Sequence, residues 1–493
     1  MDRITVKDAI AYMSPNSKRA RHDTSCGTAA SSASASASTA AAAPLNRAAA
    51  FRASRDYASF SAEQRAAFED ALRGASMFIT GRAGTGKSWL LRGIIQALPP
   101  SSTFVTATTG VAAVNIGGTT VHAFGGIGIG NDNSDKAVKK AARGFAGKRW
   151  RMCKTLVIDE ISMLDSGLLD LLNRVAQCAR GSLLPFGGIH VIACGDFLQL
   201  PPVQPRSEAE QRGFAFQSPV WQQLFTRSVM LRHVFRQDDG SRFCAFLDNV
   251  RMGQVTPDVH QMLLELRATR LATGDGIEPT ILHTHRDDVD GTNTARLAAL
   301  PGEQHVYMAV DTGTEPFLGQ LQRGCIARAT LYLKAGAQVM LLKNISPERG
   351  LVNGARGVLL DFQPNLKEPG ELLPCVKFAC GETRVLARET WDVMLGDTPV
   401  ASRRQVPLDL AWALTVHKSQ GMTLDRVQLR LDRVFAPGMA YVALSRVRRP
   451  EHMELLAYDA ARIRADATVL KFYESLATSS ALHVPADPRH KRL

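Results

Sequence analysis

Two patterns of apolar residues alternate along most of the chain: short continuous runs and stretches with helical spacing. Short apolar runs occur at MFIT (77–80), STFVTA (102–107), KTLVID (154–159) and GIHVIACGD (188–196). Between them lie stretches with apolar residues at helical spacing, such as SAEQRAAFEDALRG (61–74) and DSGLLDLLNRVAQCA (165–179). Strands that alternate with helices predict a parallel sheet covered by helices, and continuously apolar strands are typical of sheets buried on both faces.

A second alternation begins at VMLRHVF (229–235) and PTILHTH (279–285) and resumes at PLDLAWALTVHKSQG (407–421). The interruption at 303–403 is rich in short β-like runs (HVYMAV, AQVMLLKN, GVLLDF, CVKFA) separated by Gly and Pro. We therefore expect two α/β lobes, the first at 59–228 and the second at 229–302 and 404–475. A small β-barrel-like insertion is expected at 303–403. A second insertion, 127–151, is basic, with Lys136, Lys139, Lys140, Arg143, Lys148, Arg149 and Arg151.

Both ends of the chain differ from these lobes. Residues 1–58 contain a low-complexity Ser/Ala run that buries little surface, so they are expected to be a disordered tail. Within it, SKRAR (17–21) is either a nuclear localisation signal or a solvated charge run. A mitochondrial presequence is the third interpretation, but acidic residues at 2, 8 and 23 disfavour it. We expect a nuclear protein, with the mitochondrion as the alternative, and a basic tail at 476–493.

Charge and cysteine content narrow the class of protein. The 493 residues include 59 Lys and Arg against 46 Asp and Glu, a formal net charge of +13 that favours a polyanionic partner such as nucleic acid. No uncharged apolar run approaches the roughly 18 residues of a membrane span, so no membrane partner is expected. The eight cysteines form no CxxC pair, which indicates reduced thiols and no Cys/His metal site.

The strongest chemical signal is GRAGTGKS, which follows the apolar run MFIT and precedes the helix-like SWLLRGIIQAL. It matches the phosphate-binding pattern GxxxxGK[ST] in the strand–loop–helix context that the pattern requires. Its glycines let backbone N–H groups point at phosphates, Lys87 reaches the β- and γ-phosphates, and the Ser88 hydroxyl holds Mg²⁺. The predicted ATP-binding residues of this loop are Gly81, Arg82, Ala83, Gly84, Thr85, Gly86, Lys87 and Ser88.

An acidic pair and two glutamines extend the predicted nucleotide site. Asp159 ends the apolar run in LVIDEISML, so it is expected to bind Mg²⁺ beside the loop. Glu160 follows it and is expected to orient or deprotonate the attacking water. Gln64 lies just ahead of the first strand, where it either hydrogen-bonds adenine or is an ordinary helix-surface residue. Gln199 in GDFLQLPPV is expected to sense the γ-phosphate.

Three loops at strand ends indicate what the nucleotide drives. They are TATTGVAAVNIGGTTVHAFGG (106–126), GDFLQLPPV (195–203) and LTVHKSQGMTLDRV (414–427). Small donors in the first suit a phosphate backbone, and the second offers Phe197 and the Pro201–Pro202 pair as a rigid surface for bases. The third adds His417, Lys418 and Ser419. Each loop alone is equally compatible with an ordinary turn, but their combination is not.

Over residues 60 to 458 the chain resembles the petite-integration-frequency (Pif) DNA helicases of superfamily one. The resemblance rests on stretches in a fixed order: GRAGTGKS, TATTGVAA, VIDEISM, PFGGIHVIACGDFLQLPPV, VFRQ, VHKSQGMT and YVALSRV. PFGGI ahead of CGDFLQLPPV is the most specific, because it resembles the stretch that separates these helicases from RecD-like relatives. The resemblance implies two RecA-like P-loop lobes, a small domain at 127–151 that parts the duplex, and an SH3-like domain at 303–403.

The resemblance also assigns roles to matching residues. Arg236 and Arg446 match the two γ-phosphate arginines, supplied by the second lobe, and Gln420 and Gly421 match positions where that lobe meets the nucleotide. The positions that match single-stranded DNA contacts are Thr109, His122, Phe197, His417 and Ser419, to which the loops add Pro202 and Lys418.

The sequence therefore predicts an ATP- and Mg²⁺-dependent 5′-to-3′ DNA helicase that acts on single-stranded and forked DNA in genome maintenance. The protein is expected to be a monomer in solution, and its oligomeric state on DNA stays open. Replication, repair, recombination, telomere and organellar roles all stay open. One alternative is a translocase that strips proteins from single strands without separating duplexes. A binding protein with an inactive nucleotide site is disfavoured by the intact catalytic residues, and a GTPase by the absence of an NKxD-type motif.

Overall fold

The computed structural model describes residues 44–481, apart from 129, 131, 204–211, 272–275, 316 and 396–397. The cluster SKRAR and most of the expected N-terminal tail lie outside these residues, so the predicted nuclear localisation stays a prediction. Within the described part of the chain, the helices are too short or too polar to cross a lipid bilayer.

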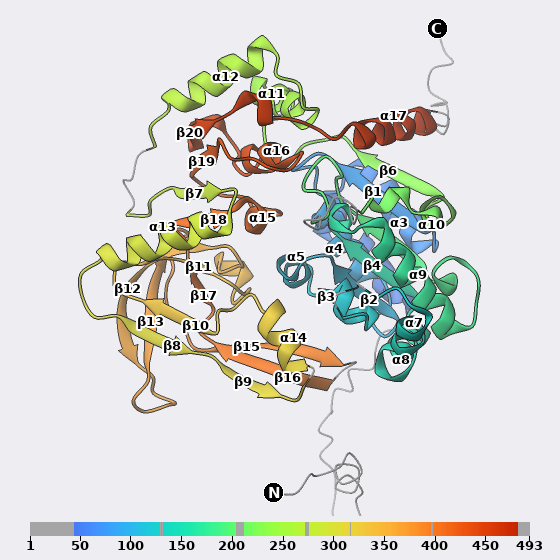
Figure 1. The fold of residues 1–493 in the computed structure, drawn as a ribbon, viewed down its shortest axis with the longest axis horizontal. Helices are drawn as coiled ribbons and strands as arrows, with labels where there is room; N and C mark the ends of the chain where they lie inside the picture. Colours follow the sequence, from blue (N-terminus) through green and yellow to red (C-terminus); the bar gives the residue numbers. More distant parts are fainter. Residues whose placement is uncertain are drawn as a thin grey trace, which may run out of the picture. The chain divides into compact units, whose positions relative to one another are not determined.

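Six parallel strands form the sheet of the first lobe, in the order β3-β2-β4-β5-β1-β6 (Figure 1). Its strands are β1 (Met77–Gly81), β2 (Thr103–Ala107), β3 (Thr119–Thr120), β4 (Thr155–Asp159), β5 (His190–Cys194) and β6 (Arg227–Leu231). Its helices are α3 (Ala62–Leu72), α4 (Lys87–Ala97), α5 (Gly110–Asn115), α6 (Val121–Gly125), α7 (Asp135–Ala141), α8 (Gly144–Met152), α9 (Ser166–Arg180) and α10 (Pro219–Leu224).

Both faces of this sheet are buried, as its continuously apolar strands predict. Met77 and Ile79 of β1 pack in a core with α3 and α4, whereas Phe78 between them packs in a second core with α9 and α10. Successive side chains of a strand point to opposite faces, so an all-apolar strand needs helices on both sides. The α/β class predicted from the sequence is confirmed.

The sheet of the second lobe has four parallel strands in the order β18-β7-β19-β20. They are β7 (Thr280–His283), β18 (Ala413–Thr415), β19 (Val427–Leu431) and β20 (Met453–Tyr458). The helices associated with them are α11 (Arg242–Arg251), α12 (Pro257–Ala268), α13 (Arg286–Ala299), α15 (Val416–Ser419) and α16 (Met439–Leu444). Short 3₁₀ turns are η1 (Ile161–Met163), η2 (Pro185–Gly188), η4 (Ala215–Gln217), η5 (Pro347–Arg349), η6 (Pro450–His452) and η7 (Ala460–Arg462).

Antiparallel strands occupy the interruption of the second alternation. They are β8 (His305–Met308), β9 (Val310–Gly313), β10 (Thr330–Leu333), β11 (Gln338–Leu341), β12 (Arg356–Pro364), β13 (Leu372–Phe378), β14 (Thr383–Val385), β15 (Glu389–Leu395), β16 (Thr398–Gln405) and β17 (Leu408–Leu410), with helix α14 (Phe317–Gly324). Their sheets have the orders β14-β13-β12-β11-β17, β15-β16-β9 and β10-β8. The chain thus enters this region after α13 and returns to the parallel sheet at β18.

The expected disordered tail is wrong for residues 44–58, which form α1 (Pro44–Arg52) and α2 (Arg55–Ala58). Phe51 is buried and packs against the rings of Phe60 and Phe68, at centroid distances of 5.8 and 5.2 Å. A Cβ on Gly93 of α4 would lie 2.6 Å from the Phe51 ring, so the glycine leaves room for that aromatic side chain. The packing of Phe51 on Phe60 and Phe68 therefore orders a stretch whose Ala content suggests disorder.

Two further predicted boundaries are wrong. Strand β6 pairs with β1, so it belongs to the first lobe although it lies at the boundary predicted for residue 229. The last helix, α17 (Ala467–Ala481), follows β20 of the second lobe but buries Val469 and Tyr473 in the core of the first. Residues 467–475 therefore do not belong to the second lobe, and the helix extends beyond the predicted start of a basic tail at 476. An apolar helix pattern reveals a buried face, but not which sheet that face covers.

Candidate functional site

The phosphate-binding loop turns sharply between β1 and α4. Gly84 and Gly86 have φ of +85° and +78°, a left-handed conformation that glycine adopts without steric cost. A Cβ on Gly84 would lie 2.6 Å from the Cβ of Arg236, and one on Gly81 2.5 Å from the Leu231 carbonyl oxygen. The glycines therefore allow both the turn and the close approach of the segment that follows β6.

Lys87 begins α4, with Gly86 as its N-cap. Its ammonium donates to the carbonyl oxygens of Gly81 and Arg82, at 2.7 and 2.9 Å. Thr85 Oγ1 also donates to the Arg82 carbonyl, at 2.9 Å. The positive end of α4 and the Lys87 ammonium thus lie together, an arrangement that attracts phosphate.

The acidic pair lies at the carboxyl end of β4. Burial, and after it the neighbouring Glu160 carboxylate, raises the pKa of Asp159 to about 7. Burial also raises the pKa of Glu160, against the opposing effects of Lys87 and a hydrogen bond from Gln420. Glu160 has a φ of +53°, unusual for a residue with a side chain and found most often at functional sites.

Asp159 and Ser88 fit a magnesium ion. Mg²⁺ in nucleotide sites takes one or two protein oxygens and completes its shell with phosphate oxygens and water. Burial and the neighbouring Glu160 carboxylate raise the pKa of Asp159, so a cation at this position would be electrostatically favoured. Among the described residues there is no group of three or more His, Cys, Asp or Glu that would form an all-protein metal cage.

Arg446 lies in the loop after α16 and is 1% exposed. Its guanidinium donates to the carbonyl oxygens of Val442 at 2.6 Å, and of Ser419 and Met422 at 3.3 Å each. Burial, followed by repulsion from Arg236, lowers its pKa to about 9. A buried cation with a depressed pKa is stabilised by an incoming anion.

Arg236 lies in the connection between β6 of the first lobe and α11 of the second. The resemblance had implied that the second lobe itself supplies this arginine. The backbone N–H of Phe235 donates to the Gly84 carbonyl in the first lobe, at 2.8 Å. The Arg236 side chain donates to the Ser445 carbonyl in the second lobe, at 3.0 Å. Burial lowers the pKa of Arg236. The arginine thus touches both lobes and is placed to respond to their relative movement.

A second link between the lobes joins the acidic pair to the loop after α15. Gln420 Nε2 donates to Glu160 Oε2 at 2.9 Å. Gly421 follows with a φ of +79°, and a Cβ there would lie 4.0 Å from Glu160 Oε1. This places Gln420 and Gly421 beside the residue predicted to activate water.

These residues surround a cavity of about 650 Å³ between the lobes. Its walls include ten of the predicted site residues: Ala83, Gly84, Gly86, Lys87, Ser88, Glu160, Gln199, Arg236, Gly421 and Arg446. A cavity of this size accommodates a nucleotide triphosphate. Its walls also carry Trp89, Phe235 and Arg448, which the sequence analysis missed. Phe235 is 51% exposed, and its position next to Arg236 in VFRQ is the signal that would have revealed it.

Gln64 differs from its predicted role as an adenine reader. It is 1% exposed, its Oε1 accepts from Ser61 N–H at 2.9 Å, and its Nε2 donates to the Thr85 carbonyl at 3.3 Å. The side chain therefore closes a capping box at the start of α3 and braces the phosphate-binding loop. The structure brings Gln64 to the nucleotide loop but commits its polar atoms to the protein.

The predicted DNA contacts divide into accessible and buried residues. Thr109, His122, His417 and Lys418 are partly exposed. Thr109 caps α5, and the preceding Thr108 Oγ1 donates to the Glu160 carbonyl at 2.9 Å, which connects this loop to the acidic pair. Lys418 Nζ lies 3.3 Å from Asp409 Oδ2.

Phe197, Pro202 and Ser419 differ from these four residues, because all three are buried. The ring of Phe197 is 2% exposed and packs edge-on against the ring of Phe216 at 4.9 Å, so it has no free face for a base. Ser419 is fully buried, and its hydroxyl donates to the Val416 carbonyl at 2.8 Å. These side chains support the loops from beneath.

Phe435 is an exposed ring that the sequence analysis missed. It is 48% exposed and lies nearly parallel to the His417 ring, with an interplanar angle of 18° and a centroid distance of 6.0 Å. His285 lies on it as well, at 5.2 Å. No motif marks Phe435, because its neighbours come from other parts of the sequence.

Together, the fold and the cavity define a P-loop nucleotide-binding protein with two parallel-sheet lobes. Residues 59–261 match the family model of the PIF1-like helicases, and residues 316–362 match that of the 2B domain of DNA helicase Pif1. The chain belongs to the PIF1-like helicase family.

Similarity to individual proteins extends over most of the chain. It is 46% identical over 424 residues to the ATP-dependent DNA helicase PIF1 of Xenopus laevis, covering 86% of this chain but 65% of the frog protein. The chain thus spans slightly less than two thirds of the length of that curated relative. The crystal structure of Pif1 helicase from Candida albicans is 40% identical, with a TM-score of 0.73, and covers 85% of this chain and 99% of that one. The structure of Pif1 helicase from Bacteroides in complex with ADP-AlF3 and ssDNA is 30% identical, with a TM-score of 0.62. The match covers 85% of this chain and 97% of that one.

Proposed function

We propose that this chain is an ATP-dependent DNA helicase that moves 5′ to 3′ along single-stranded DNA and separates duplexes. The observation that carries the proposal is the cavity between the lobes, where Lys87 and Glu160 of the first lobe face Arg446 of the second. The relatives named as ATP-dependent DNA helicases, and the Bacteroides protein bound to ADP-AlF3 and ssDNA, support the same activity. The direction is the one that the resemblance implies.

The residues suggest how hydrolysis proceeds. Lys87 and the start of α4 bind the β- and γ-phosphates, while Glu160, with its raised pKa, accepts a proton from the attacking water. Mg²⁺, held by Asp159 and Ser88, would neutralise charge on the phosphates. Arg236 and Arg446 stabilise the charge that develops on the transferred group. Phe235, exposed in the cavity wall, offers a ring on which the adenine base stacks.

Two loops link the site of ATP hydrolysis to the residues predicted to contact the DNA strand. Thr108 joins the acidic pair to the loop that carries Thr109, and Gln420 joins it to the loop that carries His417 and Lys418. Exposed Phe435 lies beside His417 and is suited to stack a base without sequence preference. Because one chain supplies every residue of the nucleotide site, we propose that the protein is a monomer in solution and that it acts on single-stranded and forked DNA.

The direct test uses duplexes that carry one single-stranded tail. The protein should unwind a duplex with a 5′ tail in the presence of ATP and magnesium, and should leave a duplex with only a 3′ tail intact. Omitting ATP is the control for strand separation by binding alone. Unwinding only from the 3′ tail would contradict the direction, and hydrolysis without DNA stimulation would contradict the helicase assignment.

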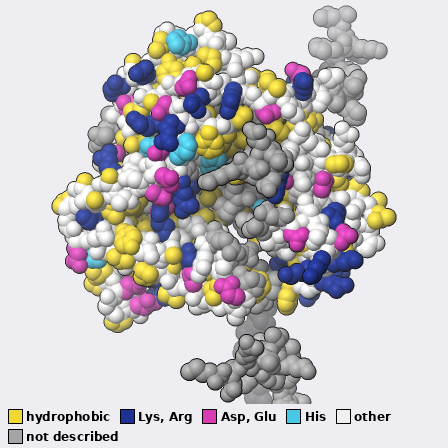
Figure 2. Space-filling model, viewed as in Figure 1, with side chains coloured by type: hydrophobic (Ala, Val, Ile, Leu, Met, Phe, Trp, Pro, Cys, Tyr) yellow, Lys and Arg dark blue, Asp and Glu magenta, His cyan; other side chains and the backbone are white. Residues whose placement is uncertain are grey.

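The second candidate function is a translocase that does not separate duplexes. Helices α7 and α8 allow it to be told apart from a helicase, because their basic surface would be needed only for duplex separation. Figure 2 shows a cluster of Lys and Arg side chains on the part of the surface that these helices occupy. The exposed basic residues there are Lys136, Lys139, Lys140, Arg143, Lys148 and Arg151. Arg149, in contrast, donates to the Ala123 and Phe124 carbonyls at 2.6 and 2.9 Å and so has a structural role.

Changing Lys136, Lys139 and Lys140 together to Glu should separate the two functions. We expect unwinding of a forked duplex to fall at least about tenfold, because three phosphate-contacting charges are reversed. The single-strand-stimulated ATPase should stay within about twofold, since the nucleotide cavity is untouched. The matched triple change to Arg keeps the charge and should unwind normally. Normal unwinding by the Glu variant would show that this surface takes no part in duplex separation.

A further inference from the structure

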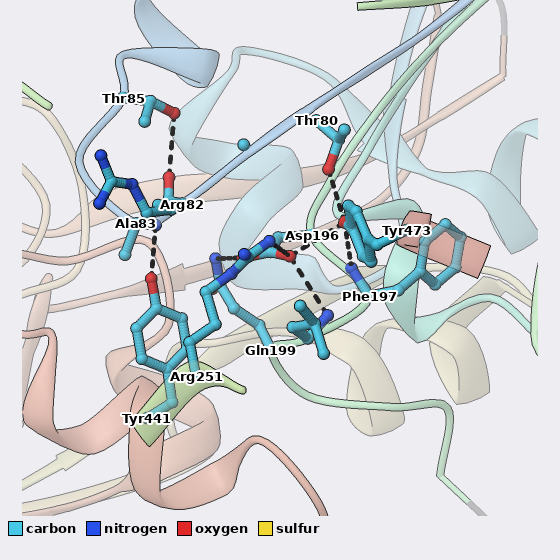
Figure 3. A network of polar contacts seen from close by, with 12 residues as sticks. Thr80, Arg82, Ala83, Thr85, Asp196, Phe197, Gln199, Arg251, Tyr441 and Tyr473 are labelled. Atoms are coloured by element: carbon cyan, nitrogen blue, oxygen red, sulfur yellow. Dashed lines mark hydrogen bonds and ion pairs between the residues drawn. The ribbon is translucent and has the colours of Figure 1, made fainter. Parts of the chain in front are cut away.

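The carboxylate of Asp196, buried behind the nucleotide cavity, accepts hydrogen bonds from three parts of the chain. Asp196 follows β5 in the loop that carries Gln199, and it is fully buried. Gln199 Nε2 donates to Asp196 Oδ2 at 3.3 Å. Figure 3 shows Asp196 at the centre of a polar network, with Gln199, Arg251 and Tyr473 around it. The orientation of Gln199, a residue of the cavity wall, thus depends on where Asp196 is held.

The second lobe holds Asp196 through the last residue of α11. Arg251 donates from Nε to Asp196 Oδ2 at 3.1 Å and from its terminal nitrogen to Oδ1 at 2.7 Å, a two-point contact that fixes orientation as well as distance. Burial alone would raise the pKa of Asp196, but the pairing with Arg251 outweighs it and holds the pKa below its usual range. The pair is therefore ionised at neutral pH.

Helix α17 holds the same carboxylate from the other side. The Tyr473 hydroxyl donates to Asp196 Oδ1 at 3.0 Å and accepts from the Phe197 N–H at 3.2 Å. It lies 2.6 Å from Oγ1 of Thr80, the residue of β1 just before the phosphate-binding loop. The Arg251 guanidinium lies over the Tyr473 ring, 5.2 Å from its centroid. A single hydroxyl thus joins the loop of Gln199 to the strand that carries the phosphate-binding loop.

Helix α11 contacts the phosphate-binding loop as well. Asp248, one turn before Arg251, forms an ion pair with Arg82 of that loop. Tyr441 of α16 accepts a hydrogen bond from the N–H of Ala83 at 2.8 Å. The second lobe thus contacts both loops that line the phosphate end of the cavity, one through Asp248 and the other through Arg251.

We propose that Tyr473 and Arg251 are positioning residues that set Gln199 against the γ-phosphate by fixing Asp196 between the second lobe and the last helix. This role depends on the proposed ATP hydrolysis. It explains how a movement of the second lobe would change the position of Gln199 relative to the γ-phosphate. When α11 shifts with its lobe, Arg251 carries Asp196 with it. Tyr473, anchored in the first-lobe core by α17, limits that displacement.

The test is the removal of one oxygen atom by Tyr473→Phe, which keeps the ring. The single-strand-stimulated kcat should fall roughly tenfold, the usual consequence of losing one hydrogen bond to a charged group. The KM for ATP should change less than about twofold, because the phosphate-binding loop itself is intact. Tyr57→Phe is the matched control: it removes a hydroxyl that donates to Glu69 Oε1 at 3.2 Å, and it should leave kcat unchanged.

A double-mutant cycle with Gln199→Ala distinguishes positioning from general stabilisation. If Tyr473 acts through Gln199, Tyr473→Phe should change kcat less than about twofold in the Gln199→Ala background. An equal loss in both backgrounds would overturn the proposal, as would an unchanged kcat in the single variant. If Tyr473→Phe does not fold, Arg251→Lys, which keeps the charge but loses the two-point contact, must show the same dependence on Gln199. A wild-type protein without DNA-stimulated hydrolysis would instead overturn the proposed function.

Discussion

Replacing Arg236 with Ala should lower the single-strand-stimulated kcat for ATP hydrolysis about a thousandfold, the lower end of the range for an arginine that contacts a transferred phosphoryl group. Burial lowers the pKa of this guanidinium, which indicates an environment in which an anionic partner is favoured. The side chain contributes mainly when charge develops on the phosphoryl group. We therefore expect the loss to appear in kcat, with a smaller change in the KM for ATP.

Steady-state ATPase kinetics with saturating single-stranded DNA measure this effect, and Arg232→Ala is the matched control. Arg232 lies four positions earlier and is exposed, and it contacts its neighbours through backbone atoms. Its removal should change kcat less than about twofold. A loss below about tenfold for Arg236→Ala would mean that Arg446 alone stabilises the transferred group.

Replacing Glu160 with Gln should lower kcat by about 10²–10⁴, the contribution of a general base, while making the nucleotide-free protein more stable. Burial raises the pKa of both Asp159 and Glu160, so ionisation of the pair opposes folding. A carboxyl with a raised pKa in the folded state loses stability as the pH rises through that pKa. The amide removes this cost, and Tm should rise by a few degrees, more at pH 8 than at pH 5.

Glu454→Gln is the control for this change. Glu454 is also buried and accepts a hydrogen bond from a glutamine, Gln428 Nε2, at 3.0 Å, much as Glu160 accepts from Gln420. The control variant should hydrolyse ATP normally. Thermal unfolding of both proteins without nucleotide at the two pH values gives the comparison. A lower Tm for Glu160→Gln would show that the hydrogen bond from Gln420 matters more than the buried charge.

The sequence predicts local chemistry well, because a motif and its flanking elements are contiguous. GRAGTGKS between an apolar run and a helical pattern is sufficient to place Lys87 and Ser88, and LVIDEISML to place the acidic pair. The parallel order of the sheet follows from strands that alternate with helices. Each of these inferences uses residues within one βα unit, where covalent geometry limits the possible arrangements.

Contacts between distant segments were not predictable in this way. Phe197 is adjacent to catalytic residues in sequence, yet its ring lies in the core, because exposure depends on which helix covers the loop. The capping box of Gln64 is a local S-x-x-Q pattern, but its contact with the Thr85 carbonyl joins segments 21 positions apart. Asp196, Arg251 and Tyr473 are separated by 55 and by more than 200 positions, so no pattern joins them. Spacing records periodicity within an element, whereas these roles arise from packing between elements.

The position of α17 has a consequence for the order in which the protein is made. The Phe472 ring stacks on Phe216 of the first lobe at a centroid distance of 4.1 Å, and Val469 and Tyr473 complete the same core. Synthesis proceeds from the N-terminus, so the first lobe leaves the ribosome hundreds of residues before the helix that covers it. Until then its aromatic core is open on one side. The aromatic core of the first lobe is therefore completed only after α17 has been synthesised.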